Sequence, residues 1–254
     1  MTAAPPDAAG RWVLRRHARP DARLRLLCLP HAGGDTWMFA DWHNALPPSV
    51  DVCPIRLPGR GSRIADPAIA DLDALVAALV DGLSGLLDRP FAVFGHSMGA
   101  LIGVTLARAL ARERGLSPVL FCAAACRAPH LVGALAPISQ LPDHLLLAAM
   151  QRRYGRPLDF ADNPDLLRLV LPTLRADLSL CETPMPSRRD LACPIVAYGG
   201  RHDASVDAAA LDGWEDHTSG AFRYHVLDGD HFFPIGAKAE LLPVLAEDLG
   251  WAMS

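Results

Sequence analysis

Residues 95–99 read Gly-His-Ser-Met-Gly, which is a Gly-x-Ser-x-Gly motif. An apolar run at residues 91–94 precedes the motif, and a helical pattern at residues 100–114 follows it. A nucleophile elbow requires this strand-turn-helix context, because the glycines permit a sharp turn that presents the serine at the start of a helix. We therefore predict that Ser97 is a catalytic nucleophile and that the Met98 N–H is one donor of an oxyanion hole.

A serine hydroxyl is a weak nucleophile until a histidine accepts its proton and a carboxylate orients that histidine. In α/β-hydrolases the acid follows the serine in the chain and the histidine follows the acid. A strand-like run at residues 195–198 opens into Gly-Gly-Arg-His-Asp, which makes Asp203 the candidate acid. The run at residues 222–227 opens into Asp-Gly-Asp-His, which makes His231 the candidate base. The alternative acids are Asp207, Asp228 and Asp230.

An oxyanion hole also needs a second N–H donor, usually from the loop after an early strand. The apolar run at residues 24–29 leads into Pro-His-Ala-Gly-Gly at residues 30–34, whose small residues let the backbone approach a ligand. We predict that Ala32 supplies this donor, and the neighbouring His31 and Gly33 remain open alternatives.

Strand-like and helix-like segments alternate along the chain, which is typical of a largely parallel α/β sheet. Arg11–Arg16 is expected to form an additional edge strand. Helices are predicted at residues 72–87 and 100–114, the second ending at Gly115 as a left-handed cap. The predicted strands are residues 24–29, 50–55, 91–94, 118–123, 195–198 and 222–227.

Residues 129–186 interrupt this alternation. They are rich in Leu, Arg and Pro and show helical patterns at residues 141–154 and 164–180, without a convincing strand. We therefore expect one hydrolase core formed by residues 1–128 and 187–254, with residues 129–186 as a helical insertion. Such an insertion acts as a lid over the site or packs simply as extra helices.

Composition excludes several classes of function. The 254 residues carry a formal net charge of −4, so there is no overall positive field to hold a nucleic acid. The apolar runs are shorter than the roughly 18 residues of a membrane helix, and the N-terminus lacks the apolar core of a signal peptide, so we expect a cytoplasmic protein. No metal-ligand motif and no Gly-x-Gly-x-x-Gly motif occurs, so neither a metal nor a dinucleotide cofactor is expected.

Five segments together give the chain a more specific resemblance. From about Leu24 to Gly250 it resembles the type II thioesterases, the discrete editing enzymes of nonribosomal peptide and polyketide synthases. The segments are Leu-Pro-His-Ala-Gly-Gly (29–34), Leu-Pro-Gly-Arg (57–60), Gly-His-Ser-Met-Gly-Ala (95–100), Leu-Pro-Thr-Leu-Arg-Ala-Asp (171–177) and Gly-Asp-His-Phe-Phe (229–233). One departure is Asp230, which stands where a second glycine is usual in the family.

The resemblance implies an α/β-hydrolase fold, with a mostly parallel central sheet flanked by helices and an inserted helical lid. It implies hydrolysis of acyl or aminoacyl thioesters on the phosphopantetheine arm of acyl or peptidyl carrier proteins, in which Ser97, His231 and Asp203 form the triad and Ala32 and Met98 the oxyanion hole. The substrate carries the phosphopantetheine, so the enzyme needs no cofactor of its own. Two other functions stay open: a general carboxylesterase or peptidase of the same fold, and a non-catalytic carrier- or acyl-binding protein.

Overall fold

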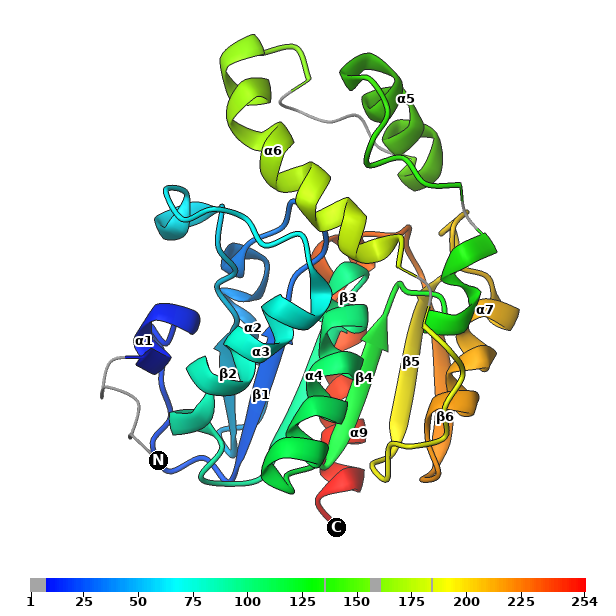
Figure 1. The fold of residues 1–254 in the computed structure, drawn as a ribbon. Helices are drawn as coiled ribbons and strands as arrows, with labels where there is room; N and C mark the ends of the chain where they lie inside the picture. The colour runs from blue at the N-terminus through cyan, green and yellow to red at the C-terminus, as the bar shows by residue number, and fades with distance from the viewer. Residues whose placement is uncertain (1–7, 135, 156–160, 184) are drawn as a thin grey trace.

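A computed structural model describes residues 8–134, 136–155, 161–183 and 185–254 of the chain. Within this part, six strands form one parallel sheet in the order β2-β1-β3-β4-β5-β6 (Figure 1). The predicted parallel α/β architecture is therefore confirmed. The strands are β1 (Leu24–Leu29), β2 (Val50–Pro54), β3 (Phe91–His96), β4 (Leu120–Ala124), β5 (Ile195–Gly200) and β6 (Phe222–Leu227).

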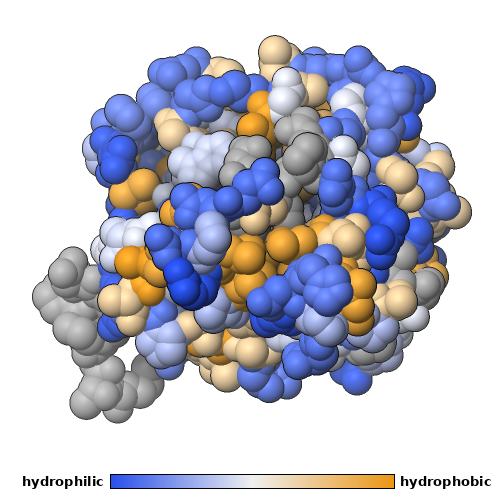
Figure 2. Space-filling view, turned by 90° about the horizontal axis from the view of Figure 1, so that it is seen from above, coloured by the Kyte–Doolittle hydropathy of each residue, from blue (hydrophilic) through white to orange (hydrophobic). Residues whose placement is uncertain are grey.

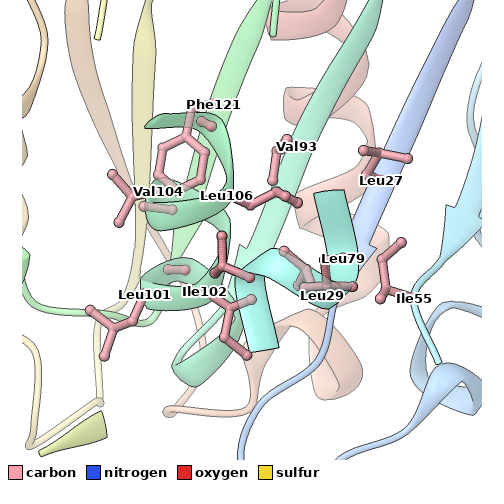
Figure 3. Close-up of a cluster of buried hydrophobic side chains, with 14 of the residues drawn as sticks. Leu27, Leu29, Ile55, Leu79, Val93, Leu101, Ile102, Val104, Leu106 and Phe121 are labelled. Carbon is pink, nitrogen blue, oxygen red and sulfur yellow. The ribbon is translucent and has the colours of Figure 1, made fainter. Parts of the chain in front are cut away.

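Helices cover both faces of the sheet, which is why its inner strands are almost continuously apolar. Leu27 and Leu29 of β1 face α3 and α4, whereas Leu26 and Cys28 face α2 and α9. Figure 3 shows the first of these two cores, with Val93 on its strand and Leu79 and Ile102 on the covering helices. The helices outside the insertion are α1 (Ala8–Trp12), α2 (Trp42–Ala45), α3 (Leu72–Gly82), α4 (Met98–Arg114), α7 (Ala208–Asp212), α8 (Phe233–Gly236) and α9 (Lys238–Ala252).

The strand register brings the carboxyl ends of the strands to one edge of the sheet. Residues at the carboxyl ends of neighbouring strands pair across the sheet: Leu29 with Gly95, His96 with Ala124, and Gly200 with Leu227. The loops that follow β1, β3, β5 and β6 therefore meet at this edge, the usual place for ligands in open α/β sheets.

Two helices differ in length from their predictions. The helix predicted over 100–114 begins at Met98, directly after Ser97, and ends as expected before Gly115, which has φ 64°. The helix predicted over 72–87 ends at Gly82 and continues as a short 3₁₀ turn, Ser84–Leu86. Gly82 is a poor helix former, and its lack of a side chain makes room for the Trp12 ring, since a Cβ there would lie 2.2 Å from Trp12 Cδ1.

The prediction of an edge strand over Arg11–Arg16 is wrong. Ala8–Trp12 is a short helix, and beyond it only a single antiparallel bridge joins Val13 to Ile55 among the described residues. Trp12 and Val13 are both buried although they are neighbours in the chain, whereas a strand would point them to opposite sides. Trp12 packs under the Arg63 guanidinium, 4.3 Å from the ring centroid, so side-chain packing decides the conformation here.

The segment between β4 and β5, residues 129–186, is called the insertion segment below. Its described residues form a 3₁₀ helix (Pro129–Ala134), α5 (Asp143–Tyr154) and α6 (Pro164–Cys181), in agreement with the two helices predicted there. Helices α5 and α6 stand above the carboxyl edge of the sheet (Figure 1) and share a small apolar core that includes Leu146, Met150 and Leu174. Seen from that side, apolar side chains gather in the middle of the face with polar ones around them (Figure 2). None of the described helices is long and apolar enough to cross a membrane.

Candidate active site

Ser97 occupies the sharp turn between β3 and α4. Its backbone has φ 54° and ψ −113°, a conformation that is strained for any residue with a side chain. The glycines around it are required sterically. A Cβ on Gly95 would lie 2.3 Å from the Gly99 carbonyl oxygen, and a Cβ on Gly99 would lie 2.2 Å from the Leu29 carbonyl oxygen. The Ser97 N–H donates to the Ala124 carbonyl at 2.8 Å, which ties the turn to β4.

The structure brings Ser97, His231 and Asp203 together although they come from three different loops. His231 Nε2 lies 3.0 Å from Ser97 Oγ, and His231 Nδ1 lies 2.7 Å from Asp203 Oδ2. Both His231 and Asp203 are buried. An ionised carboxylate only accepts hydrogen bonds, so the Nδ1 proton points to Asp203 and Nε2 is left to accept the serine proton. This arrangement is that of a general base oriented by an acid.

Asp203 is held by a residue that the sequence analysis did not identify. The Ser205 N–H and hydroxyl both donate to Asp203 Oδ1, at 2.8 and 2.6 Å. Burial raises the pKa of Asp203, but the hydrogen bond and charge of His231 and the two donors of Ser205 outweigh burial, so the pKa lies below its ordinary value of 3.8. A serine two residues after an aspartate is typical of such a turn and was the available signal.

The alternative acids have other partners. Asp207 caps α7 by accepting the Ala210 N–H, and Asp228 lies at an exposed position opposite His202. Asp230 accepts the Phe232 N–H at 2.8 Å, which shapes the loop that carries His231. Asp203 is thus the carboxylate that contacts Nδ1 of His231.

His96, next to the nucleophile in sequence, holds the loop that carries His231. Its Nε2 donates to the His231 carbonyl at 2.8 Å. The ring is fully buried, and this burial lowers the pKa of His96 well below its ordinary value, so the ring is neutral at neutral pH. The Tyr154 ring of α5 also packs against the His231 ring, with centroids 4.5 Å apart, so the insertion segment touches the imidazole directly.

The two predicted oxyanion donors lie beside the serine. Met98 begins α4, and Ala32 lines a small cavity of about 20 Å³ together with Ser97 and His231. Neither the Ala32 N–H nor the Met98 N–H donates a hydrogen bond to another described residue. The Gly33 N–H is occupied, because it donates to Asp177 at 2.7 Å. The Gly33 N–H is therefore not available to a ligand, whereas the predicted donors Ala32 and Met98 are, and so is the alternative His31, whose N–H has no hydrogen bond to another described residue either.

A narrow apolar cavity of about 60 Å³ opens next to Ser97. It lies between the carboxyl edge of the sheet and the insertion segment, and its walls come from both. Apolar residues that line it include Met98, Leu101, Cys126, Val132 and Cys181. A larger hollow of about 520 Å³ lies by β2, around Trp37 and Arg56, and contains none of the five predicted site residues. Among the described residues, no three potential metal ligands cluster.

Comparisons with known proteins agree with this geometry. A family model described as a thioesterase domain matches residues 24–249. The chain belongs to the thioesterase family. The RedJ thioesterase of the prodiginine pathway of Streptomyces coelicolor is 35% identical and superimposes with a TM-score of 0.80, covering 97% of this chain and 90% of RedJ. The type II thioesterase BorB of the borrelidin cluster is 32% identical with a TM-score of 0.80, covering 93% of this chain and 96% of BorB.

A further relative bears a different name. The linear gramicidin dehydrogenase LgrE of Brevibacillus parabrevis is 36% identical over 94% of this chain and 92% of its own length. The present chain has no Gly-x-Gly-x-x-Gly motif for a dinucleotide. The α/β-hydrolase fold and the type II thioesterase family predicted from the sequence motifs are confirmed, and the protein is a thioester hydrolase.

Proposed function

We propose that this thioesterase removes acyl groups from phosphopantetheine thioesters on carrier proteins, with Ser97 as the nucleophile, His231 as the base and Asp203 as the orienting acid. The observation that carries the proposal is the continuous hydrogen-bond chain from Ser97 Oγ through His231 to Asp203 at the carboxyl edge of the sheet. The free N–H groups of Ala32 and Met98 beside it supply the oxyanion hole.

Acylation begins when Ser97 Oγ attacks the thioester carbonyl carbon and His231 Nε2 accepts the hydroxyl proton. The carbonyl π electrons move to oxygen, and the Ala32 and Met98 N–H groups bind the resulting oxyanion. The tetrahedral intermediate then collapses, the carbon–sulfur bond breaks, and His231 returns its proton to the leaving thiolate. Asp203 stabilises the imidazolium throughout, because its pKa lies below the ordinary value and it stays ionised.

Deacylation repeats these steps with water as the nucleophile. His231 Nε2 accepts a proton from the water as its oxygen attacks the acyl-serine carbonyl, and the same two N–H groups hold the second oxyanion. Collapse breaks the bond to Ser97 Oγ, which regains a proton from His231, and the free carboxylic acid leaves. No cofactor takes part in either half of the reaction, because phosphopantetheine arrives as part of the substrate.

The cavity beside Ser97 suggests the size of the acyl group. A volume of about 60 Å³ holds a few water-sized spheres, and its walls are mostly apolar. We infer that short acyl chains fit with the insertion segment in the position seen here. Longer chains require α5, which contributes Arg153 and Tyr154 to the cavity wall, to move, and this makes the insertion segment a lid that selects substrates.

The comparisons support the carrier-protein partner. RedJ and BorB belong to natural-product pathways, those of prodiginine and borrelidin, and LgrE is named for linear gramicidin. An editing role, in which the enzyme clears stalled or misprimed acyl groups from the carriers of such a synthase, follows from this relationship.

Initial hydrolysis rates on one short acyl group test the proposal. The group is presented on a phosphopantetheinylated carrier protein, as a small thioester and as an oxygen ester, each with wild type and Ser97→Ala. We expect the highest kcat/KM on the carrier, and we expect Ser97→Ala to lower it by several orders of magnitude while the circular dichroism spectrum is kept. Preference for the oxygen ester would favour a general esterase, and full activity of a folded Ser97→Ala protein would rule out the serine mechanism.

A further inference from the structure

Helix α6 of the insertion segment reaches the loop that carries the oxyanion donor Ala32. Asp177, in the second half of α6, accepts the Gly33 N–H through Oδ2 at 2.7 Å. Gly33 follows Ala32 directly and has φ 74°, so this contact fixes a tight turn of the loop. A helix inserted between β4 and β5 thereby holds a loop that follows β1.

Arg60 completes this contact from a third part of the chain. Its guanidinium donates to both oxygens of Asp177, at 2.6 and 2.8 Å, and Nη1 also donates to the Gly34 carbonyl at 3.1 Å. Arg60 is 7% exposed and Asp177 is 2% exposed, so both charges are desolvated. Arg60 and Asp177 thus bind each other. Asp177 also binds the Gly33 N–H, and Arg60 also binds the Gly34 carbonyl.

These bonds determine which way the peptides of the loop face. The peptide between Ala32 and Gly33 is held at both ends, because Asp177 accepts its N–H and His31 Nδ1 donates to its carbonyl at 2.9 Å. The preceding peptide has its carbonyl bound by the Gly34 N–H at 2.9 Å. Its own N–H, that of Ala32, is left free beside Ser97.

We propose that Arg60 and Asp177 are a positioning pair, which aims the Ala32 N–H at the oxyanion and makes the oxyanion hole depend on the insertion segment being in place. Neither side chain touches the reacting atoms. The pair acts through the glycine peptides, so its effect falls on the transition state, where the oxyanion exists, and not on binding of the ground-state thioester. The inference rests on the serine mechanism proposed above.

A purely stabilising role explains the pair less well. Replacing a buried ion pair with apolar side chains of similar volume is often neutral or favourable for stability. Apolar side chains cannot, however, accept a glycine N–H or donate to a glycine carbonyl. The two roles therefore predict different results for the same substitution.

The test is the double variant Arg60→Met/Asp177→Leu, which removes both charges while leucine keeps the branching of aspartate and methionine most of the length of arginine. Activity is measured on a small acyl thioester, so that carrier binding does not enter. We expect kcat to fall by about 10- to 100-fold with KM within about threefold, because loss of an oxyanion donor costs roughly 10²–10³ and a misaimed donor costs less. The inhibition constant of an alkyl trifluoromethyl ketone, which adds the serine hydroxyl and forms an oxyanion, should rise by the same factor.

Thr173→Val is the matched control. Thr173 lies one turn earlier on α6 and donates to the Gly59 carbonyl at 2.9 Å, so it joins the same helix to the same neighbouring loop without touching residues 32–34. We expect kcat and inhibitor affinity within about twofold of wild type for this variant. A loss in Thr173→Val equal to that of the double variant would mean that helix anchoring in general matters, and would overturn the proposal.

Arg60→Lys decides the matter if the double variant does not fold. Lysine keeps the charge opposite Asp177 but lacks the planar fork that reaches the Gly34 carbonyl at the same time. A fall in kcat of about fivefold with unchanged KM supports positioning, and unchanged kcat overturns it. Ser97→Ala, measured in parallel, separates the two levels: an active Ser97→Ala protein refutes the serine mechanism, whereas an inactive one beside fully active Arg60 variants refutes only the positioning pair.

Discussion

The nucleophile elbow and the insertion segment are held in place in different ways. The elbow is held by contacts between backbone atoms. The Ser97 N–H donates to a β4 carbonyl, and neighbouring backbone leaves no space for a Cβ on Gly95 or Gly99. The insertion segment is attached by side chains, namely Thr173 and Ser179 to backbone carbonyls and Asp177 to Arg60. Among the described residues, no side-chain hydrogen bond joins α5 to the sheet. Helix α5 packs mainly on α6, through their shared apolar core.

This difference separates the reaction from the choice of substrate. Atoms that react must keep their separations to within a fraction of an ångström, and strand ends in register provide this. Walls that select an acyl chain tolerate movement, and helices attached at a few points provide that. Two residues of the insertion segment are exceptions: Asp177 contacts the loop of the oxyanion donor, and Tyr154 packs on the His231 ring.

The largest effect on the chemical step is expected for Asp203, the acid that orients His231. Asp203→Asn should lower kcat by about 10³- to 10⁴-fold, because an amide does not stabilise the imidazolium and favours the wrong tautomer of His231. The protein should stay folded, since the amide keeps an oxygen for the Ser205 donors. Steady-state kinetics and a thermal melt measure the two quantities.

Asp228→Asn is the control for that experiment. Asp228 lies three residues before His231 in the chain, but its side chain is 73% exposed and faces His202. We expect kcat within about twofold of wild type. If Asp228→Asn were the damaging change and Asp203→Asn were not, the acid would be misassigned and the triad geometry would not be the one that acts.

A second experiment compares the two regions through their glycines. Gly99→Ala should cost about 3 kcal/mol of stability or more and abolish activity, because the new Cβ would lie 2.2 Å from the Leu29 carbonyl oxygen. Gly155→Ala, at the end of α5, places its Cβ in open space at φ 72°. It should cost only about 1 kcal/mol, the price of a left-handed residue, and leave kcat unchanged. Chemical denaturation and kinetics measure both, and equal costs would contradict the distinction between the two regions.

The sequence was sufficient for the elbow because its signal is local. Gly95, Ser97 and Gly99 lie within five residues, directly between a strand pattern and a helix pattern, and β1 and β6 have the bounds that were predicted. The order acid-then-histidine placed Asp203 and His231 behind the two last strands. For Arg11–Arg16 the expected edge strand does not form, because burial of the Trp12 ring determines that segment.

The supporting contacts were beyond sequence reasoning because they join distant residues. Arg60 and Asp177 are 117 positions apart, and His96 meets the His231 carbonyl 135 positions away. The sequence around each residue does not indicate its partner, although Arg60 and Asp177 both lie in segments that carried the family resemblance. A buried arginine becomes recognisable as such only when the loop it contacts has been placed.

The last effect is on stability in acid and leaves the reaction untouched; it concerns the contact between His217 and the start of the insertion segment. His217, fully buried behind α7, accepts from Arg108 Nη2 at Nδ1 (3.0 Å) and donates from Nε2 to Nδ1 of His130, the second residue of the insertion segment (2.9 Å). Burial, then the Arg108 and His130 charges, lower the pKa of His217 from 6.5 to about 4. Between pH 6.5 and 4, His217 is therefore protonated in the unfolded chain but not in the folded protein. The free energy of unfolding falls as the pH falls through this window.

His217→Gln isolates this contribution, because glutamine can accept from Arg108 and donate to His130 but does not titrate. Between pH 7 and pH 4.5 wild type should lose about 2 kcal/mol more stability than the variant, which urea denaturation at several pH values measures. His144→Gln, on the exposed part of α5, controls for removal of a histidine as such. If both variants reduced the pH dependence of stability equally, His217 would not be the source of the acid sensitivity. Its contact with His130 would then not be the acid-sensitive contact between the insertion segment and the core.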